Sequence, residues 1–202
     1  MCLALIAWQC CAETPLIVGF NRDEFFARPT EHAQDWGDYI GGQDCVSQGT
    51  WLAVKGHRFS AVTNLKNTFA PGAKSRGQLV RQFVAGQDPA LAYAKHIEYS
   101  QYSYFNLLLC DGKQLVAVTN PAQSPQVLAP GYYIVTNDEF DYTTSNLELD
   151  NVDNIFHLLE QKHVRKDSVY GTRSSTVLIN NTLYERTYDC NGFVQNQSQI
   201  KI

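Results

Sequence analysis

Short apolar runs separated by turn residues occupy the first third of the chain. Residues 3–8, 16–20, 51–54 and 59–63 are rich in aliphatic and aromatic side chains, which is typical of β-strands. Lys55, Gly56 and His57 separate the last two runs, as a turn would in a hairpin. The pattern therefore predicts antiparallel hairpins at the start of the fold.

The middle of the chain changes to a helical period. Apolar residues recur at helical spacing from Leu79 to Phe83, directly after a polar segment. A second helical stretch covers residues 89–96, with Pro89 in its first turn and Asp88 as the expected cap. Two helices of this kind can cover one face of a sheet.

The remainder of the chain returns to strands around one further helix. The helical period reappears over residues 152–163. The strands are expected at residues 105–109, 115–119, 132–136, 175–179 and 183–188. This order favours an α+β fold with antiparallel sheets over a parallel doubly wound sheet. Because the chain has 202 residues and no repeat or linker, we expect a single domain over residues 1–202.

Charge and hydropathy exclude several classes of function. The 16 Lys and Arg residues are balanced by 20 Asp and Glu residues, so no basic surface for nucleic acid is expected. No apolar run approaches the roughly 20 residues that a membrane span needs. Residues 3–8 lack the basic flank and the length of a signal peptide. We expect a cytoplasmic or organelle-matrix protein without a membrane span.

The six cysteines are expected to be reduced, because the chain shows no export signal and is too large to need disulfides. Five of them are interpreted as structural thiols: Cys10, Cys11, Cys45, Cys110 and Cys190. The five histidines have no ligand-like spacing, and the chain contains no phosphate-binding loop, dinucleotide fingerprint or serine-hydrolase elbow. We therefore predict no metal and no cofactor.

Cys2 stands out because removal of Met1 would place a thiol and a free α-amine on one residue. In unperturbed form the amine titrates near pH 8 and the thiol near pH 8.5, so modest shifts by the environment would make either group useful at neutral pH. The amine can then take the thiol proton, directly or through water. The other interpretation is an ordinary residue at a chain terminus.

The charged segment Asn21-Arg22-Asp23-Glu24 follows the second predicted strand. If the first two strands form a hairpin that turns at residues 12 and 13, Cys2 lies opposite Asp23 to within about two positions. Asp23 can then hold the terminal ammonium, and Arg22 can favour the thiolate. The alternative is a solvated, charged turn.

Other polar residues lie at strand ends. Three strands end in Val-Thr-Asn, at Asn64, Asn120 and Asn137. Asparagine there usually makes a turn, but its amide can also stabilise an oxyanion by about 3 kcal/mol. Residues 170–176 place Arg173 and several hydroxyls before an apolar strand, where the arginine can pair with a carboxylate or bind a substrate anion.

Residues 21–29 resemble the signature of the NRDE family, the transport-and-Golgi-organisation proteins, whose members also begin Met-Cys. Four further segments resemble the same family. They are Gly49-Thr50-Trp51-Leu52, Val62-Thr63-Asn64, Ser75-Arg76-Gly77-Gln78-Leu79-Val80 and Tyr170-Gly171-Thr172-Arg173-Ser174-Ser175-Thr176-Val177. The matching segments occur in order from residue 2 to about residue 178, so they cover most of the chain.

A more distant similarity links the chain to cysteine N-terminal-nucleophile amidases such as bile salt hydrolases and penicillin V acylases. That resemblance implies a four-layer αββα sandwich with Cys2 as the nucleophile. It also implies that Asp23 orients the amine, that Asn64 and Asn137 stabilise the oxyanion, and that Arg173 organises the carboxylates or the substrate.

The similarity to the amidases is incomplete at one arginine. The amidases carry it directly after the glycine of the second strand, whereas this chain has Gly19-Phe20 there and its arginine is Arg22. A shift of two residues keeps the same face of the strand but moves the side chain about 7 Å. Arg22 and Asn21 are therefore expected to support the site or bind substrate.

The resemblance implies hydrolysis of a linear, non-peptide amide, with a small-molecule amide as substrate. The alternative is a non-catalytic protein of the NRDE family that binds a small molecule or haem or takes part in trafficking, in which Cys2 ligates haem iron or only packs. Loss of Met1 separates these possibilities, because only the enzyme needs the free amine of Cys2.

Overall fold

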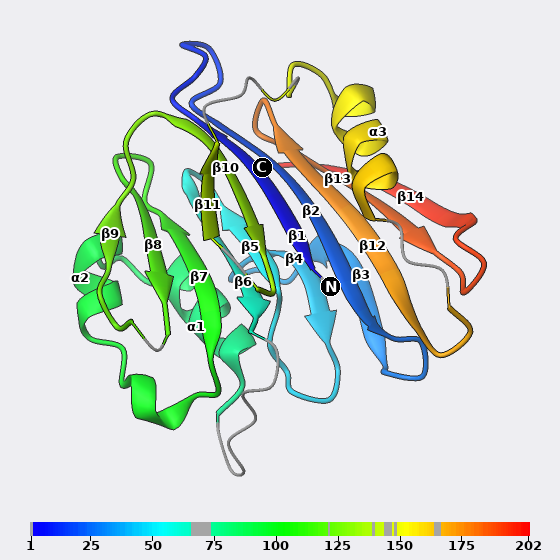
Figure 1. The fold of residues 1–202 in the computed structure, drawn as a ribbon, viewed down its shortest axis with the longest axis horizontal. Helices are drawn as coiled ribbons and strands as arrows, with labels where there is room; N and C mark the ends of the chain where they lie inside the picture. Colours follow the sequence, from blue (N-terminus) through cyan, green and yellow to red (C-terminus); the bar gives the residue numbers. More distant parts are fainter. Residues whose placement is uncertain are drawn as a thin grey trace. The chain divides into compact units, whose positions relative to one another are not determined.

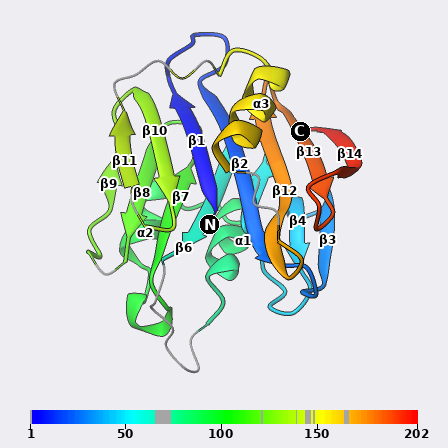
Figure 2. The ribbon, with the colours of Figure 1, turned by 45° about the vertical axis from the view of Figure 1, so that its right-hand side comes forward.

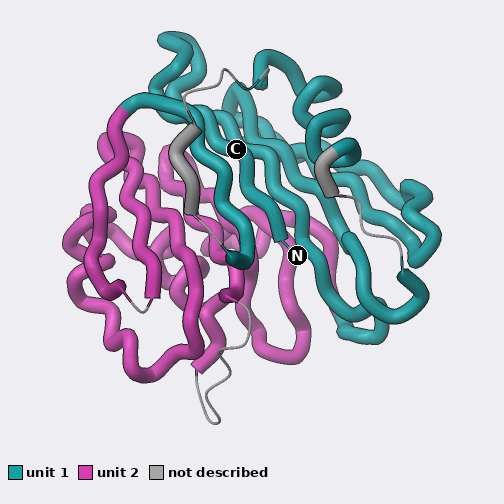
Figure 3. Tube along the Cα trace, in the orientation of Figure 1, with its two compact units in different colours: residues 1–29, 130–202 teal, residues 30–129 magenta. Residues whose placement is uncertain are grey.

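The structure, a computed structural model, describes residues 2–65, 74–120, 122–138, 140–143, 147, 149–163 and 167–202. Over these residues the chain is mostly strands, arranged in two seven-stranded antiparallel sheets, with a few helices (Figure 1). The chain divides into two compact units, residues 1–29 with 130–202, and residues 30–129 (Figure 3). Each unit holds one sheet, which confirms the predicted antiparallel α+β class.

The sheet of the first unit has the strand order β11-β10-β1-β2-β12-β13-β14. Its strands are β1 (Leu3–Trp8), β2 (Leu16–Phe25), β10 (Gly131–Thr136), β11 (Phe140–Thr143), β12 (Tyr170–Ile179), β13 (Thr182–Tyr188) and β14 (Val194–Lys201). β1 and β2 form the predicted hairpin at the centre of this sheet, and β10 and β12 flank it. The N-terminus therefore lies in the middle of a sheet.

Helix α3 (Val152–His163) covers one face of this sheet, beside β2 and β12 (Figure 2). The side chain of Asn151 caps its start by accepting the Asn154 backbone N–H at 2.9 Å. Ile155 and Leu159 are fully buried in the cluster that the helix forms with the strands, and each contributes roughly 1.5–3 kcal/mol. Gly19 allows the close approach, because a Cβ there would lie 2.7 Å from the Ile155 side chain.

The second unit contains the strands β3 to β9 in sequential order. They are β3 (Thr30–Asp35), β4 (Ile40–Asp44), β5 (Leu52–Lys55), β6 (Arg58–Asn64), β7 (Phe105–Cys110), β8 (Leu115–Thr119) and β9 (Gln126–Val127). The helices α1 (Arg76–Ala85) and α2 (Ala90–Lys95) and a 3-10 turn, η1 (Tyr99–Gln101), lie between β6 and β7. Leu79, Val80 and Phe83 of α1 pack in the core of this unit, as the helical spacing predicts.

Two glycines let α1 touch the loop before β5. A Cβ on Gly49 would lie 2.8 Å from the backbone of Gly77, and a Cβ on Gly77 would lie 2.8 Å from the backbone of Thr50. The Thr50 N–H donates to the Gly77 carbonyl at 3.3 Å across this crossing. The glycines of two of the family-like segments therefore have a packing role.

The end of α1 is fastened by an arginine that the sequence did not point to. Arg58 is buried, and its guanidinium donates to the carbonyls of Phe83 and Asp88 at 2.9 Å. It also stacks 4.1 Å above the ring centroid of Phe83. Burial lowers the pKa of Arg58, but the carbonyl oxygens and the ring satisfy the cation.

Most of the predicted elements are confirmed, including the helix over residues 152–163. The prediction that Asp88 caps α2 was wrong, because the cap position is Pro89 and the Ala90 N–H donates to the Asp111 carboxylate at 2.9 Å. β3, β4, β9, β11 and β14 were not predicted. None of the helices in the described segments is long and apolar enough to cross a bilayer.

Candidate functional site

The register of the first sheet brings Cys2, Arg22 and Asn137 together. Leu3 of β1 pairs with Asn21 of β2 on one side and with Thr136 of β10 on the other. One residue earlier, the same register sets Cys2 between Arg22 and Asn137, on strands about 4.8 Å apart. The offset from the predicted partner Asp23 is one residue, within the stated tolerance.

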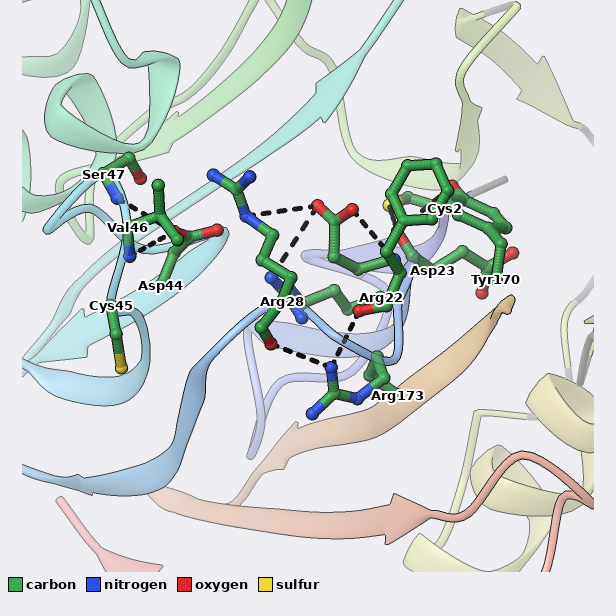
Figure 4. A network of polar contacts seen from close by, with 12 residues as sticks. Cys2, Arg22, Asp23, Arg28, Asp44, Cys45, Val46, Ser47, Tyr170 and Arg173 are labelled. Atoms are coloured by element: carbon green, nitrogen blue, oxygen red, sulfur yellow. Dashed lines mark hydrogen bonds and ion pairs between the residues drawn. The ribbon is translucent and has the colours of Figure 1, made fainter. Parts of the chain in front are cut away.

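The offset of one residue decides which part of Asp23 meets Cys2. Because side chains alternate along a strand, the side chains of Arg22 and Asp23 lie on opposite faces of the sheet. The Cys2 Sγ lies 3.9 Å from the backbone carbonyl oxygen of Asp23, and Tyr170 donates its hydroxyl to the same oxygen at 3.2 Å (Figure 4). Cys2 therefore meets the backbone of Asp23.

The carboxylate of Asp23 is held by a neighbouring hydroxyl. Asp23 is buried, and Thr172 Oγ1 donates to its Oδ1 at 2.7 Å. Thr172 is itself buried and is the cross-strand partner of Asp23. This hydrogen bond holds the Asp23 carboxylate near the start of β1.

A β-bulge at Arg173 interrupts the pairing of β12 with β2. Thr172 pairs with Asp23 and Ser174 pairs with Arg22, so β12 advances two residues while β2 advances one. Arg173 is the extra residue. Its Nη1 donates to the backbone carbonyls of Phe25, Phe26 and Arg28 at 3.0–3.1 Å.

The contacts of Arg173 are with backbone carbonyls rather than with a carboxylate. Figure 4 shows its guanidinium directed at the carbonyl of Arg28. Burial lowers the pKa of Arg173, and the nearby Arg22 lowers it further, while Glu24 opposes the change. Arg173 thus fastens the end of β2 to β12.

Glu24 links two of the arginines in this region. Its Oε2 lies 3.9 Å from Nη2 of Arg22 and 3.7 Å from Nε of Arg28. Arg22 is buried and shares the Cys2 face, because it occupies the same cross-strand row. The ion pair draws the Arg22 side chain toward the end of β2.

Asn21 belongs to the opposite face. Its amide is fully buried, donates to the Leu159 carbonyl of α3 at 3.1 Å and accepts the Ser175 hydroxyl at 2.6 Å. Tyr188 in turn donates to Ser175 at 3.1 Å. Asn21 therefore joins β2 to α3 and β12, which is a supporting role.

The thiol of Cys2 is buried, with 8% of the residue exposed. Burial raises the pKa of Cys2, and the carbonyl contact with Asp23 only partly opposes this. The thiol is therefore neutral at physiological pH unless a cation is placed beside it.

Asn64 and Asn137 belong to different units. Asn137 follows β10, is buried, and shares the row of Cys2. Asn64 is the exposed last residue of β6 in the second unit. The third asparagine of the set, Asn120, is buried and donates to the Tyr99 carbonyl at 3.5 Å.

Within the described residues no group of three or more His, Cys, Asp or Glu side chains could hold a metal ion. Cysteine ligates haem iron as a thiolate. Because burial raises the pKa of the Cys2 thiol, a thiolate ligand there would form by loss of the thiol proton on binding.

Sequence comparison decides the family. The sequence profile of TANGO2, described as Transport and Golgi organisation 2, matches residues 1–162. The chain belongs to the TANGO2 family. This match confirms the predicted resemblance to the NRDE family, the transport-and-Golgi-organisation proteins.

Relatives of the TANGO2 family in animals agree with this result. The chain is 35% identical to the Transport and Golgi organization protein 2 homolog of Bos taurus over 138 residues, 60% of this chain and 50% of the relative. It is 36% identical to Transport and Golgi organization protein 2 of Drosophila melanogaster over 110 residues, 46% of this chain and 38% of the relative. The match thus spans half or less of these relatives.

Three residues around the TANGO2-family Cys2 were not singled out from sequence: Tyr170, Thr172 and Ser174. The signal that could have found them is the concentration of hydroxyls in residues 170–176. Their roles depend on the bulge at Arg173, which no sequence pattern indicates.

Proposed function

We propose that this TANGO2-family chain is an N-terminal-nucleophile cysteine hydrolase that acts on a linear, non-peptide amide. The observation that supports this proposal most directly is the row that sets Cys2 between Arg22 and Asn137 at the start of β1. Asp23, held by Thr172, lies beside the same strand start. A nucleophile, an amide donor and a carboxylate are thus available around one terminus.

The reaction requires that Met1 be removed. The freed α-amine of Cys2, with a pKa near 8 in unperturbed form, takes the thiol proton and leaves a thiolate. The thiolate attacks the amide carbonyl, and the side-chain amide of Asn137 donates to the oxyanion. The C–N bond then breaks as the α-ammonium protonates the leaving amine.

Water completes the cycle. It attacks the thioester, releases the carboxylic acid and restores the thiol, with the α-amine as base. In this proposal Asp23 orients the α-ammonium, and Arg173 holds the end of β2 in place. The free α-amine also supplies the cation that the buried thiol needs in order to ionise.

A second candidate is a non-catalytic role in small-molecule binding or trafficking. The relatives are named for transport and Golgi organization, and these names support the second candidate more directly than a hydrolase. The raised pKa of the buried Cys2 thiol also favours a packing role when Met1 is retained.

Intact mass and selective labelling separate the two candidates. The natively expressed chain is weighed and then treated with a limiting amount of iodoacetamide at pH 7, and the modified cysteine is mapped by peptide mass. The hydrolase predicts loss of one methionine and faster labelling of Cys2 than of the exposed Cys10 and Cys11. Retained Met1 with labelling confined to Cys10 and Cys11 would establish the non-catalytic candidate, and Cys2→Ala is the control.

A further inference from the structure

Ser174 of β12 carries a buried hydroxyl that the fold leaves unsatisfied. The residue is 4% exposed, and its Oγ has no hydrogen-bond partner among the described residues. Buried polar side chains nearly always find a partner, so each exception needs an explanation. Its neighbour Ser175 shows the normal case, since its Oγ bonds to both Asn21 and Tyr188.

The bulge at Arg173 determines which way Ser174 faces. In a regular strand Thr172 and Ser174 would share a face, because side chains alternate. The extra residue separates them: Thr172 binds the Asp23 carboxylate, while Ser174 stands opposite Arg22. Bulges of this kind re-aim side chains beside active sites.

The re-aimed Ser174 lies in the row that contains Cys2. The row runs from Asn137 through Cys2 and Arg22 to Ser174, so all four side chains share one face of the sheet. Arg173 locks this arrangement through its three carbonyl contacts. The ion pair with Glu24 draws the intervening Arg22 along the strand.

We propose that Ser174 is a specificity-determining residue whose hydroxyl binds a neutral polar group on the acyl part of the substrate. This inference rests on the proposed hydrolase function. Ser174 lies two strands from Cys2, roughly 10 Å between Cα atoms. Three bonds of an extended chain span roughly 3.5 Å, so about eight bonds cover that distance. The substrate class is therefore an amide of a medium-length acid with a hydroxyl or carbonyl near its far end.

The test compares two p-nitroanilides of a straight-chain acid of about eight carbons, one with a terminal hydroxyl and one without. Hydrolysis by the full chain is followed through release of p-nitroaniline. The wild-type chain is expected to prefer the hydroxylated compound by about tenfold in kcat/KM, as one buried hydrogen bond allows. Ser174→Ala should remove this preference by raising KM for the hydroxylated compound alone, with kcat unchanged.

Binding of the corresponding unreactive primary amides, measured by calorimetry, keeps the test independent of turnover. If the wild-type chain binds the hydroxylated amide more tightly and Ser174→Ala abolishes this difference in Kd, the role of Ser174 is supported even when no amide is hydrolysed. Absence of hydrolysis alone would reject only the hydrolase. Equal binding of the two amides by the wild-type chain, or a preference that survives in Ser174→Ala, overturns the proposal.

Thermal unfolding provides the matched control. Ser174→Ala should leave Tm unchanged or raise it, because the hydroxyl has no partner to lose. Ser175→Ala should lower Tm by several degrees, because Asn21 and Tyr188 each lose a partner. A fall in Tm for Ser174→Ala as large as that for Ser175→Ala would assign Ser174 a structural role and contradict the proposal.

Discussion

At the scale of single residues, burial governs the behaviour of Cys2. Burial raises the pKa of its thiol above that of an ordinary cysteine. With Met1 retained, we therefore expect Cys2 to be alkylated far more slowly at pH 7 than the exposed Cys10, and its rate to reach half-maximum only above the pH at which an ordinary thiol ionises. A pH series of iodoacetamide rates, resolved by peptide mass, measures this profile.

The same shift in pKa affects stability. A thiol with a raised pKa in the folded state stabilises the fold fully below its unfolded pKa, and this contribution is lost as pH rises through the folded pKa. The stability of Cys2→Ala should therefore fall less steeply than that of the wild type above about pH 9. Urea unfolding of both chains at pH 7 and pH 10 gives the comparison. An equal loss of unfolding free energy between the two pH values in the wild type and in Cys2→Ala would contradict the prediction.

Thr172 should contribute measurably through its bond to the buried Asp23 carboxylate. Thr172→Val keeps the shape but removes the donor, so the free energy of unfolding should fall by about 1.5–3 kcal/mol, as for hydrogen bonds to charged groups. Thr172→Ser keeps the hydroxyl and should lose less than half of that. Urea unfolding of both variants provides the measurement, and a loss in Thr172→Val no larger than that in Thr172→Ser would contradict a dominant role of the hydrogen bond.

At the scale of elements, the crossing of α1 with the loop before β5 depends on glycine. Gly77→Ala should favour the helix by about 1 kcal/mol in propensity. Its Cβ would nevertheless lie 2.8 Å from backbone atoms of Thr50, which cannot move like a flexible side chain. We expect a net loss of about 1–3 kcal/mol in thermal or urea unfolding. Gln82→Ala, at an exposed position of the same helix, is the control and should be neutral.

The elements that sequence predicted well are those with a strong apolar period. The helix over residues 152–163 matches α3 because its apolar side chains follow the helical period, and the strand over residues 3–8 matches β1 because it is an unbroken apolar run. β3 and β14 were missed because they are edge strands in which polar residues dominate. An edge strand is held mainly by backbone hydrogen bonds to its neighbour and less by an apolar face, so the hydropathy pattern of the sequence does not indicate such a strand.

The candidate site could be predicted only as far as sequence spacing determines it. The hairpin arithmetic placed Cys2 within one residue of its partner on β2. The predicted strand ended at Phe20, whereas β2 continues to Phe25 because β12 pairs with it. The bulge that sends Thr172 to Asp23 and Ser174 to the Cys2 face depends on this long-range pairing, which no local pattern contains.

At the scale of the whole molecule, the family match and the folding unit have different boundaries. The TANGO2 profile matches residues 1–162, but β12 follows that segment and pairs with β2 in the middle of the first sheet. β14, by contrast, is an edge strand that is largely exposed. The segment after residue 162 contains β12, β13 and β14, and we expect the sheet to require β12 but to tolerate the loss of the edge strand β14.

Two truncations test this difference. A chain ending at residue 162 lacks the strand that carries Thr172 and Ser175, so Asp23 and Asn21 each lose one hydrogen bond and the edge of β2 is left unpaired. We expect this chain to be insoluble or to show no cooperative unfolding by circular dichroism. A chain ending at residue 192 lacks only β14 and should unfold cooperatively, with a Tm lowered by some degrees. If the shorter chain unfolded cooperatively as well, the matched segment would be a folding unit without β12, and the bulge at Arg173 could not be required to hold the Cys2 end of the sheet.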